Sequence, residues 1–326
     1  YKGLRNSINN CFWDGKININ NILIVSGAQQ GIDVVSKALL NVNDNVIVEK
    51  PTYNGALSVF RWRRVNIFEI EVNDKGIDTE KFEEVLKKHK IKLFYTMSYF
   101  QNPTTISYSK EVKEKILYLA EKYDFYIVED DYLSELIFDS NIKYNSFKSL
   151  DKFNRVIYIK SFSKIFLPGI RLGYLVSPDK FCEVIQNSKI NTDIATSSLM
   201  QRALDIFLER NYWDENLKIL KDLYEKRYNF MNDYMNEVFK GIASFKSPGG
   251  GLNFYIKLND NISINSFDLF KMCKKEKVAI TPGGIFYKNP DEGKRFFRLN
   301  YSQTPEDKIK EGLNKICAIL RQNIIH

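Results

Sequence analysis

Hydrophobic residues in the first half of the chain occur in short runs, separated by stretches in which they recur every three or four positions. The short runs are rich in β-branched and aromatic residues and lie at 21–25, 45–49, 92–97, 125–129 and 156–159. Such runs are typical of strands covered on both faces. Between them, residues 28–40 and 109–124 carry apolar side chains on one helical face. Strands alternating with helices predict βαβ units, and therefore an α/β fold with a mostly parallel central sheet.

The apolar run at 172–176 predicts one antiparallel strand in this sheet. Only seven residues separate the run from Lys164, whereas a crossover to a parallel strand needs about a dozen residues or more. After it, residues 199–240 predict one or two long helices. Shorter strands at 248–258, 278–283 and 294–302 then alternate loosely with helices. We therefore expect a large domain over residues 1–207 and a smaller C-terminal α+β domain over 208–326.

Composition narrows the class of protein. With 44% apolar and 14% aromatic residues, the 326-residue chain can bury a large core. The sequence contains neither a signal peptide nor an apolar run of membrane-spanning length, and its four cysteines form no C-x-x-C pair. We therefore expect a cytoplasmic protein with no membrane contact and no metal. The net charge of +8 comes from scattered lysines, which predicts a solvated surface and no nucleic-acid stripe.

Histidine is nearly absent, which excludes several kinds of chemistry. His89 lies in the charged run "KKHKIK" and His326 is the last residue. Neither is placed for a catalytic triad, a metal site or a general base. The chain also enters a helical pattern directly at Tyr1. We therefore expect further sequence upstream.

Reactive and polar residues gather where the predicted strands end. Ligands of such sheets bind beyond the carboxyl ends of the strands. The residues near these ends are Gly27, Ala28, Gln29, Tyr53, Asn102, Asp130, Tyr132, Ser161, Ser163, Lys164 and Arg171. Each has an ordinary alternative: Gly27 as a strand-to-helix turn, Asp130 as a helix cap and Lys164 as a solvated charge. Together they supply an amine, a carboxylate, a stacking ring and a helix N-terminus suited to phosphate, which are the needs of pyridoxal 5'-phosphate (PLP).

Seven motifs extend this match along the chain. They are "SGAQQG", "EKPTYNG", "QNPTT", "VEDDYLSEL", "SFSKIFLPGIRLGY", "TPGGIFY" and "FFRLNYS". In order and spacing they resemble those of the fold-type I, class I/II PLP-dependent aminotransferases. The similarity is strongest to the branch that handles 2-aminoadipate, kynurenine and aromatic or branched amino acids. It implies transfer of an amino group between a small amino acid and a 2-oxo acid through a Lys164 aldimine.

The resemblance implies a role for each site residue. Ala28, Gln29, Ser161, Ser163 and Arg171 would hold the phosphate, and Tyr53 would stack on the pyridine ring. Asn102 and Tyr132 would bind the phenolic oxygen, and Asp130 the ring nitrogen. Arg298, with Asn102 beside it, would bind the substrate α-carboxylate. The bonds before Pro51 and Pro103 are predicted to be cis.

Two departures from the family pattern stand out. Thr105 occupies a position where the family usually has glycine, so the conformation of that turn is uncertain. The family works as a homodimer with a shared active site. The phosphate-binding tyrosine that the second subunit supplies should lie just upstream of Tyr1 and is not in this sequence.

Two alternatives to an aminotransferase remain. The stretch "EDDYLSEL" is similar to the MocR branch of GntR-type transcriptional regulators, in which an aminotransferase-like domain senses PLP and an amine. Such a protein would bind DNA only through an N-terminal domain absent from this chain. The second alternative interprets Ser161 to Lys164 as the S-x-x-K of a serine hydrolase, but the required S-D-N and K-T-G tripeptides do not occur.

Overall fold

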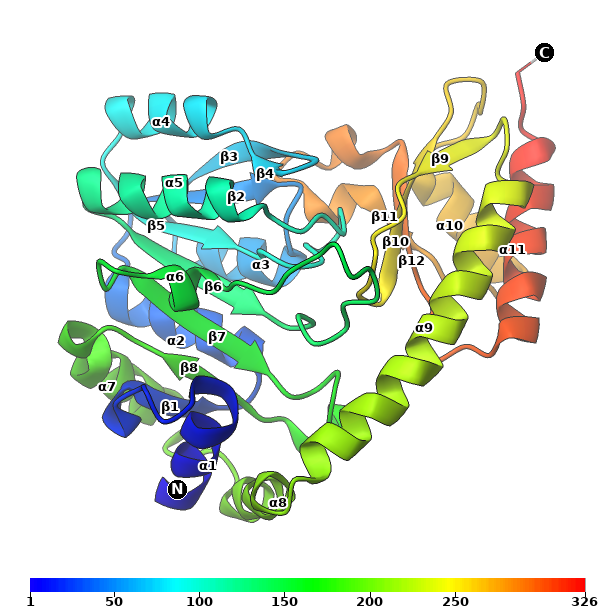
Figure 1. The fold of residues 1–326 in the computed structure, drawn as a ribbon. Helices are drawn as coiled ribbons and strands as arrows, with labels where there is room; N and C mark the ends of the chain where they lie inside the picture. Colours follow the sequence, from blue (N-terminus) through cyan, green and yellow to red (C-terminus); the bar gives the residue numbers. More distant parts are fainter. Residues whose placement is uncertain (326) are drawn as a thin grey trace.

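The computed structural model describes residues 1–325 and has two sheets, each with its own helices (Figure 1). His326, which the sequence excludes as a catalytic group, lies outside the described residues. Within residues 1–325, the larger sheet has eight strands in the order β1-β8-β7-β6-β5-β2-β3-β4. The strands are β1 (Ile22–Val25), β2 (Asn45–Lys50), β3 (Asn66–Asn73), β4 (Gly76–Ile77), β5 (Ile91–Thr96), β6 (Tyr126–Asp131), β7 (Val156–Ser161) and β8 (Gly173–Val176).

The strand directions confirm the predicted α/β sheet. β3, β2, β5, β6 and β7 pair in parallel, and β8 is antiparallel to both of its neighbours, β7 and β1. The short β4, which pairs antiparallel with β3, was not predicted. Nor was β3, because its polar residues interrupt the apolar run and only two of its eight positions are buried.

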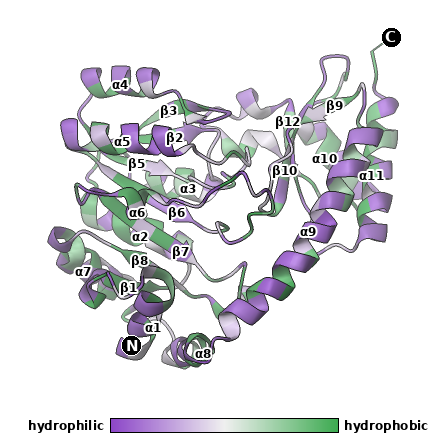
Figure 2. Cartoon of the chain, in the orientation of Figure 1, coloured by the Kyte–Doolittle hydropathy of each residue, from purple (hydrophilic) through white to green (hydrophobic). Residues whose placement is uncertain are grey.

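Helices cover both faces of the larger sheet. On one face, α2 (Ala28–Leu39) and α3 (Asn54–Trp62) bury apolar side chains against the strands. On the other face lie α4 (Thr79–Lys88), α5 (Lys110–Lys122) and the short α6 (Phe147–Leu150). Figure 2 shows this layering as apolar strands between helices with polar outer faces. Burial on both faces explains why most of these strands are uniformly apolar in sequence.

The smaller sheet is antiparallel in the order β11-β12-β10-β9. Its strands are β9 (Ala243–Phe245), β10 (Asn253–Leu258), β11 (Thr281–Pro282) and β12 (Phe296–Asn300). The remaining helices are α1 (Lys2–Trp13), α7 (Cys182–Asp193), α8 (Ser198–Glu209), α9 (Tyr212–Val238), α10 (Ser266–Lys275) and α11 (Glu306–Arg321). The long α9 runs diagonally from the larger sheet to the smaller one (Figure 1). The domain boundary at residue 208 stays a prediction, and α8 runs across it.

A close backbone approach fixes the turn at the start of α2. Gly173 of β8 lies opposite Val25, and a Cβ atom at Gly173 would stand 2.6 Å from the carbonyl oxygen of Lys160 and 3.2 Å from Gly27 Cα. Both contacts are backbone atoms, which cannot move aside without shifting the strands. The sheet therefore requires glycine at this position.

We expect Gly173→Ala to lower the free energy of unfolding by about 1–3 kcal/mol, the usual cost of overpacking. Urea unfolding followed by circular dichroism measures the change. Gly169→Ala is the matched control, because a Cβ atom there would meet nothing among residues 1–325 within 4 Å. Equal stability of the two variants would show that the strands can yield at Gly173.

No helix within residues 1–325 is long and apolar enough to cross a membrane.

Candidate active site

A cavity of about 390 Å³ lies between the carboxyl ends of the parallel strands and the smaller sheet. Its lining includes all eleven site residues expected from the sequence: Ala28, Gln29, Tyr53, Asn102, Asp130, Tyr132, Ser161, Ser163, Lys164, Arg171 and Arg298. The first ten come from the larger sheet and its loops, and Arg298 comes from β12. The topology thus brings together residues that are up to 270 positions apart, since residue 28 and residue 298 face one space.

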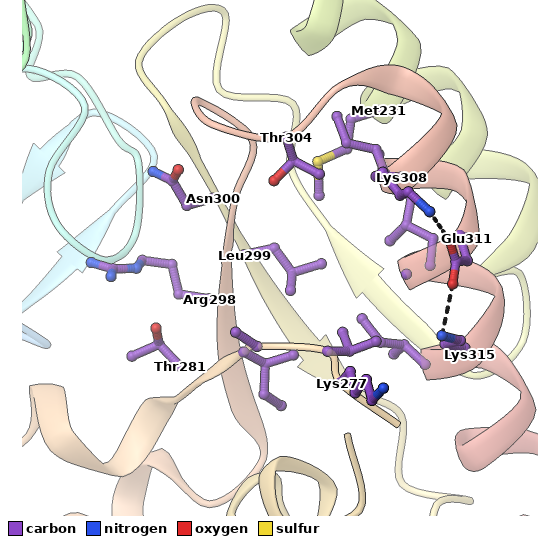
Figure 3. A pocket seen from close by; sticks show the side chains of 17 residues that line it. Met231, Lys277, Thr281, Arg298, Leu299, Asn300, Thr304, Lys308, Glu311 and Lys315 are labelled. Atoms are coloured by element: carbon purple, nitrogen blue, oxygen red, sulfur yellow. Dashed lines mark hydrogen bonds and ion pairs between the residues drawn. The ribbon is translucent and has the colours of Figure 1, made fainter. Parts of the chain in front are cut away.

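Six further residues line the cavity that the sequence did not single out. They are Met97, Leu133, Pro168, Leu252, Asn253 and Asn300. Asn300 follows Arg298 by two positions in a strand, so the period of two predicts that both side chains share a face. Figure 3 shows Arg298 and Asn300 on one side of β12, while Leu299 projects toward α11. Asn253 is the register partner of Asn300, and Asn300 donates a hydrogen bond to it at 3.0 Å.

One end of the cavity is built to attract an anion. Gly27 caps α2 with a φ of +92°, which leaves the first N–H groups of the helix, at Ala28 and Gln29, directed outward. Arg171 Nη2 donates to the carbonyl oxygen of Ser26 at 3.0 Å and holds the guanidinium beside this turn. A Cβ atom on Gly27 would approach Arg171 Nη2 to 3.1 Å. The positive end of the α2 dipole and the guanidinium of Arg171 would therefore both attract an anion bound at this turn.

Asp130 lines the cavity and is 2% exposed. Its Oδ2 accepts a hydrogen bond from the hydroxyl of Tyr95 at 2.8 Å, and its Oδ1 has no partner among the described residues. Burial raises the pKa of Asp130 to about 7, although the bond from Tyr95 lowers it. A cationic or N–H partner at the second oxygen of Asp130 would lower this pKa and favour the ionised carboxylate.

Lys164 lines the cavity, three residues past the end of β7. Its side chain as a whole is exposed, but the surrounding protein partly desolvates the amine. This desolvation, together with the positive charge of Arg298, lowers the pKa of Lys164. A lowered pKa raises the fraction of neutral amine, which is the form that attacks carbonyl carbons and accepts protons.

Arg298 is held in place from two sides. Its Nη1 donates to Asn102 Oδ1 at 2.6 Å, and its guanidinium lies 5.2 Å from the centre of the Phe286 ring. The Nε of Arg298 is buried and has no acceptor within residues 1–325. The bond to Asn102 links the smaller sheet to the larger one across the cavity.

A buried carboxylate organises the two loops that carry Tyr53 and Asn102. Glu49 accepts hydrogen bonds from Gln101 Nε2 at 2.9 Å and from the hydroxyls of Thr96 and Tyr108. The same Gln101 amide donates to the carbonyl oxygen of Pro51 at 2.7 Å. Burial raises the pKa of Glu49 to about 7. The network ties the residue before Asn102 to the loop that leads to Tyr53.

The predicted cis peptides before Pro51 and Pro103 are both present, so that prediction is confirmed. Thr105 adopts a φ of +66°, the left-handed conformation that glycine adopts without strain. The turn at Thr105 therefore has the backbone conformation expected for glycine, although threonine occupies the position.

Tyr132 reaches the cavity from the loop after β6. Its hydroxyl donates to the carbonyl oxygen of Phe100 at 2.8 Å. Ser163 follows β7, and its backbone N–H donates to Ser161 Oγ at 3.3 Å, while Ser163 Oγ is buried without a partner in the described part of the chain. Hydroxyls thus line the cavity at two separate points.

Comparison with known proteins agrees with this arrangement. The family model described as aminotransferase class I and II matches residues 15–316. The aromatic-amino-acid aminotransferase 1 of Thermococcus litoralis is 29% identical over 317 residues, which are 96% of this chain and 75% of that protein. The kynurenine aminotransferase of Pyrococcus horikoshii, solved in complex with PMP, is 30% identical with a TM-score of 0.92, over 99% of this chain and 80% of that one.

Regulators are also among the relatives. The uncharacterized HTH-type transcriptional regulator YisV of Bacillus subtilis is 28% identical over 301 residues, which are 92% of this chain but only 61% of the regulator. This chain therefore matches only part of the length of that regulator. Because the family model spans most of the sequence and the fold agrees with solved aminotransferases, the chain belongs to the aminotransferase class I and II family.

Proposed function

We propose that this protein is a PLP-dependent aminotransferase that transfers an amino group between a small amino acid and a 2-oxo acid. One observation carries the proposal: an amine, a buried carboxylate with one oxygen unpaired within residues 1–325, and an anion-attracting helix terminus face a single cavity. The mechanism of a serine hydrolase does not require this combination of three groups.

The residues present fit PLP. Four buried polar atoms of the lining have no partner within residues 1–325: Gln29 Oε1, Asp130 Oδ1, Ser163 Oγ and Arg298 Nε. Burying such atoms without hydrogen bonds costs free energy, so they favour a ligand that satisfies them. A pyridine nitrogen, a phosphate and a carboxylate are matching partners for Asp130 Oδ1, Ser163 Oγ and Arg298 Nε, in that order.

Specific residues would hold each part of the cofactor. The N–H groups of Ala28 and Gln29, the hydroxyls of Ser161 and Ser163, and Arg171 would bind the phosphate. Tyr53 would lie against the ring. Asn102 and Tyr132 would bind the phenolic oxygen, for which the Tyr132 hydroxyl must turn away from Phe100 O. When bound, the cofactor supplies an electron sink for the bonds of the substrate α-carbon.

The protein's own groups move the proton and hold the charge. Lys164 would hold the cofactor through its amine and, once that amine is free, would serve as the base that accepts the proton of the substrate α-carbon and as the acid that gives it back. A lowered pKa of Lys164 favours both directions of proton transfer. Asp130, in its ionised form, would stabilise a positive charge on the ring nitrogen of the cofactor.

Arg298 would bind the substrate α-carboxylate. A guanidinium offers two parallel N–H groups that match a carboxylate. Among the described residues that line the cavity, the remaining cationic side chains are Lys164 and Arg171, and both have roles in holding the cofactor. The cavity therefore favours amino acids with one carboxylate and an apolar or long side chain.

A panel of amino acids added to the PLP-bound protein tests the function. Aromatic, branched and dicarboxylic amino acids are compared by the absorbance of the cofactor, with 2-oxoglutarate added afterwards. Full conversion of the cofactor to its pyridoxamine form, reversed by the 2-oxo acid, is the expected result. No reversal with any amino acid would contradict the proposal.

We expect Arg298→Ala to raise KM for the best amino acid by about 10- to 100-fold, as for loss of a charged hydrogen-bond donor of about 1.5–3 kcal/mol. Steady-state kinetics measures it. Arg321→Ala, an exposed arginine at the end of α11, is the control. An unchanged KM in Arg298→Ala would show that another group binds the carboxylate.

A regulator domain is the second candidate, favoured by the similarity to YisV. Such a domain would bind PLP and an amine and then stall without transfer. The same panel separates the two, because a stalled complex does not respond to 2-oxoglutarate. Either protein would be a homodimer with a shared site, as the family resemblance implies.

A further inference from the structure

The bond between Tyr95 and Asp130 differs from the other contacts of the cavity because Tyr95 does not line it. Tyr95 lies in β5 and is fully buried, with its ring 6.0 Å from that of Phe60. Asp130 lies in the neighbouring strand β6, on the same face of the sheet. Both residues are therefore fixed by strand backbone and by core packing.

One oxygen of Asp130 is bound by the protein, and the other is available to a ligand. Oδ2 receives the Tyr95 hydroxyl at 2.8 Å, and Oδ1 is left without a partner in the described chain. A carboxylate held through one oxygen can rotate little about its Cβ–Cγ bond. Its free oxygen then keeps one direction, toward the cavity.

We propose that Tyr95 is a positioning residue, which rests on the proposed function: its hydroxyl aims Asp130 Oδ1 at the cofactor's ring nitrogen and favours the ionised carboxylate. A hydrogen bond donated to a carboxylate stabilises its charged form. Tyr95 is a suitable donor because its own ionisation is suppressed. Burial, followed by the negative charge of Asp130, raises the pKa of Tyr95 well above its usual value. The hydroxyl therefore remains a donor across the working pH range.

Tyr95→Phe removes this bond alone and keeps the ring in the core. The groups around Asp130 that carry charge or titrate are Tyr53, Asp131, Tyr132, Lys160, Lys164, Arg171 and Arg298. All of them are unchanged in the variant. Without the bond, the protonated carboxyl persists to higher pH. We therefore expect the acid limb of PLP affinity and of kcat to move up by about one to two pH units.

Tyr158→Phe is the matched control. Tyr158 is equally buried, and its hydroxyl donates to Asp131 Oδ2 at 2.8 Å, beside Asp130 in sequence but on the opposite face of the sheet. Both variants lose one buried hydroxyl-to-carboxylate bond, so their losses of stability in urea should be similar. Only Tyr95→Phe should shift the pH profiles.

The experiment titrates PLP into the apoprotein between pH 5 and 9 by fluorescence and measures kcat over the same range. A midpoint shift in Tyr95→Phe but not in Tyr158→Phe supports the proposal. Equal midpoints in the wild type and Tyr95→Phe overturn it, provided that the wild type binds PLP. A wild type that binds no PLP would instead overturn the proposed function.

Discussion

Replacing Lys164 with alanine should reduce transamination by about 10²- to 10⁴-fold, the range for loss of a positioned proton carrier. The variant loses both the amine that attaches the cofactor and the base that serves the α-carbon. Lys164→Arg should be nearly as inactive, because a guanidinium keeps its charge and cannot act as a nucleophile or base. Comparing the two separates the chemistry of the amine from its charge.

Borohydride reduction in the presence of PLP gives a second measurement. The wild type should gain one covalent adduct, which peptide mass spectrometry should locate at Lys164. Lys143→Ala, which removes a surface lysine from the loop after β6, should behave as the wild type. An adduct of equal yield in Lys164→Ala would assign the attachment to another lysine.

Asp130→Asn should still bind PLP at saturating cofactor, though more weakly than the wild type, and should lose turnover. The amide keeps the size of the side chain and an oxygen, so the phosphate and ring contacts remain. It removes the negative charge that stabilises a protonated ring nitrogen, and loss of one such electrostatic group typically reduces kcat by about 10²- to 10³-fold. Single-turnover kinetics with a saturating amino acid measures the effect.

Asp222→Asn, at an exposed position of α9, controls for a general loss of negative charge. Near-normal single-turnover rates in Asp130→Asn would mean that a different group faces the ring nitrogen. A protein that no longer binds PLP would mean that Asp130 contributes mainly to affinity.

The sequence predicts the parts of this fold that depend on continuous burial. β2, β5, β6 and β7 are covered on both faces, so their apolar runs are uninterrupted and their ends mark the site. β3 lies near an edge of the sheet, and Glu69 and Glu71 interrupt its apolar residues, so the sequence shows no continuous apolar run there.

Contacts between distant segments leave no signal in the local sequence. The bond from Tyr95 to Asp130 depends on the register of two strands, and the bond from Arg298 to Asn102 depends on how the sheets face each other. Neither has a local pattern. The place of Asn300 in the cavity could have been predicted from the sequence, because Asn300 shares a strand face with Arg298.

The restraint of Arg298 has a consequence for the thermodynamics of substrate binding. A free arginine side chain loses about 1.5–2 kcal/mol of conformational entropy when it is fixed. Here Asn102 and Phe286 already fix the guanidinium. The loss has thus largely occurred during folding, and the carboxylate needs only to take the place of Asn102 Oδ1. Calorimetry of amino-acid binding should therefore show a smaller entropic penalty for the wild type than for Asn102→Ala. In that variant the arginine is released and must be ordered by each ligand that binds.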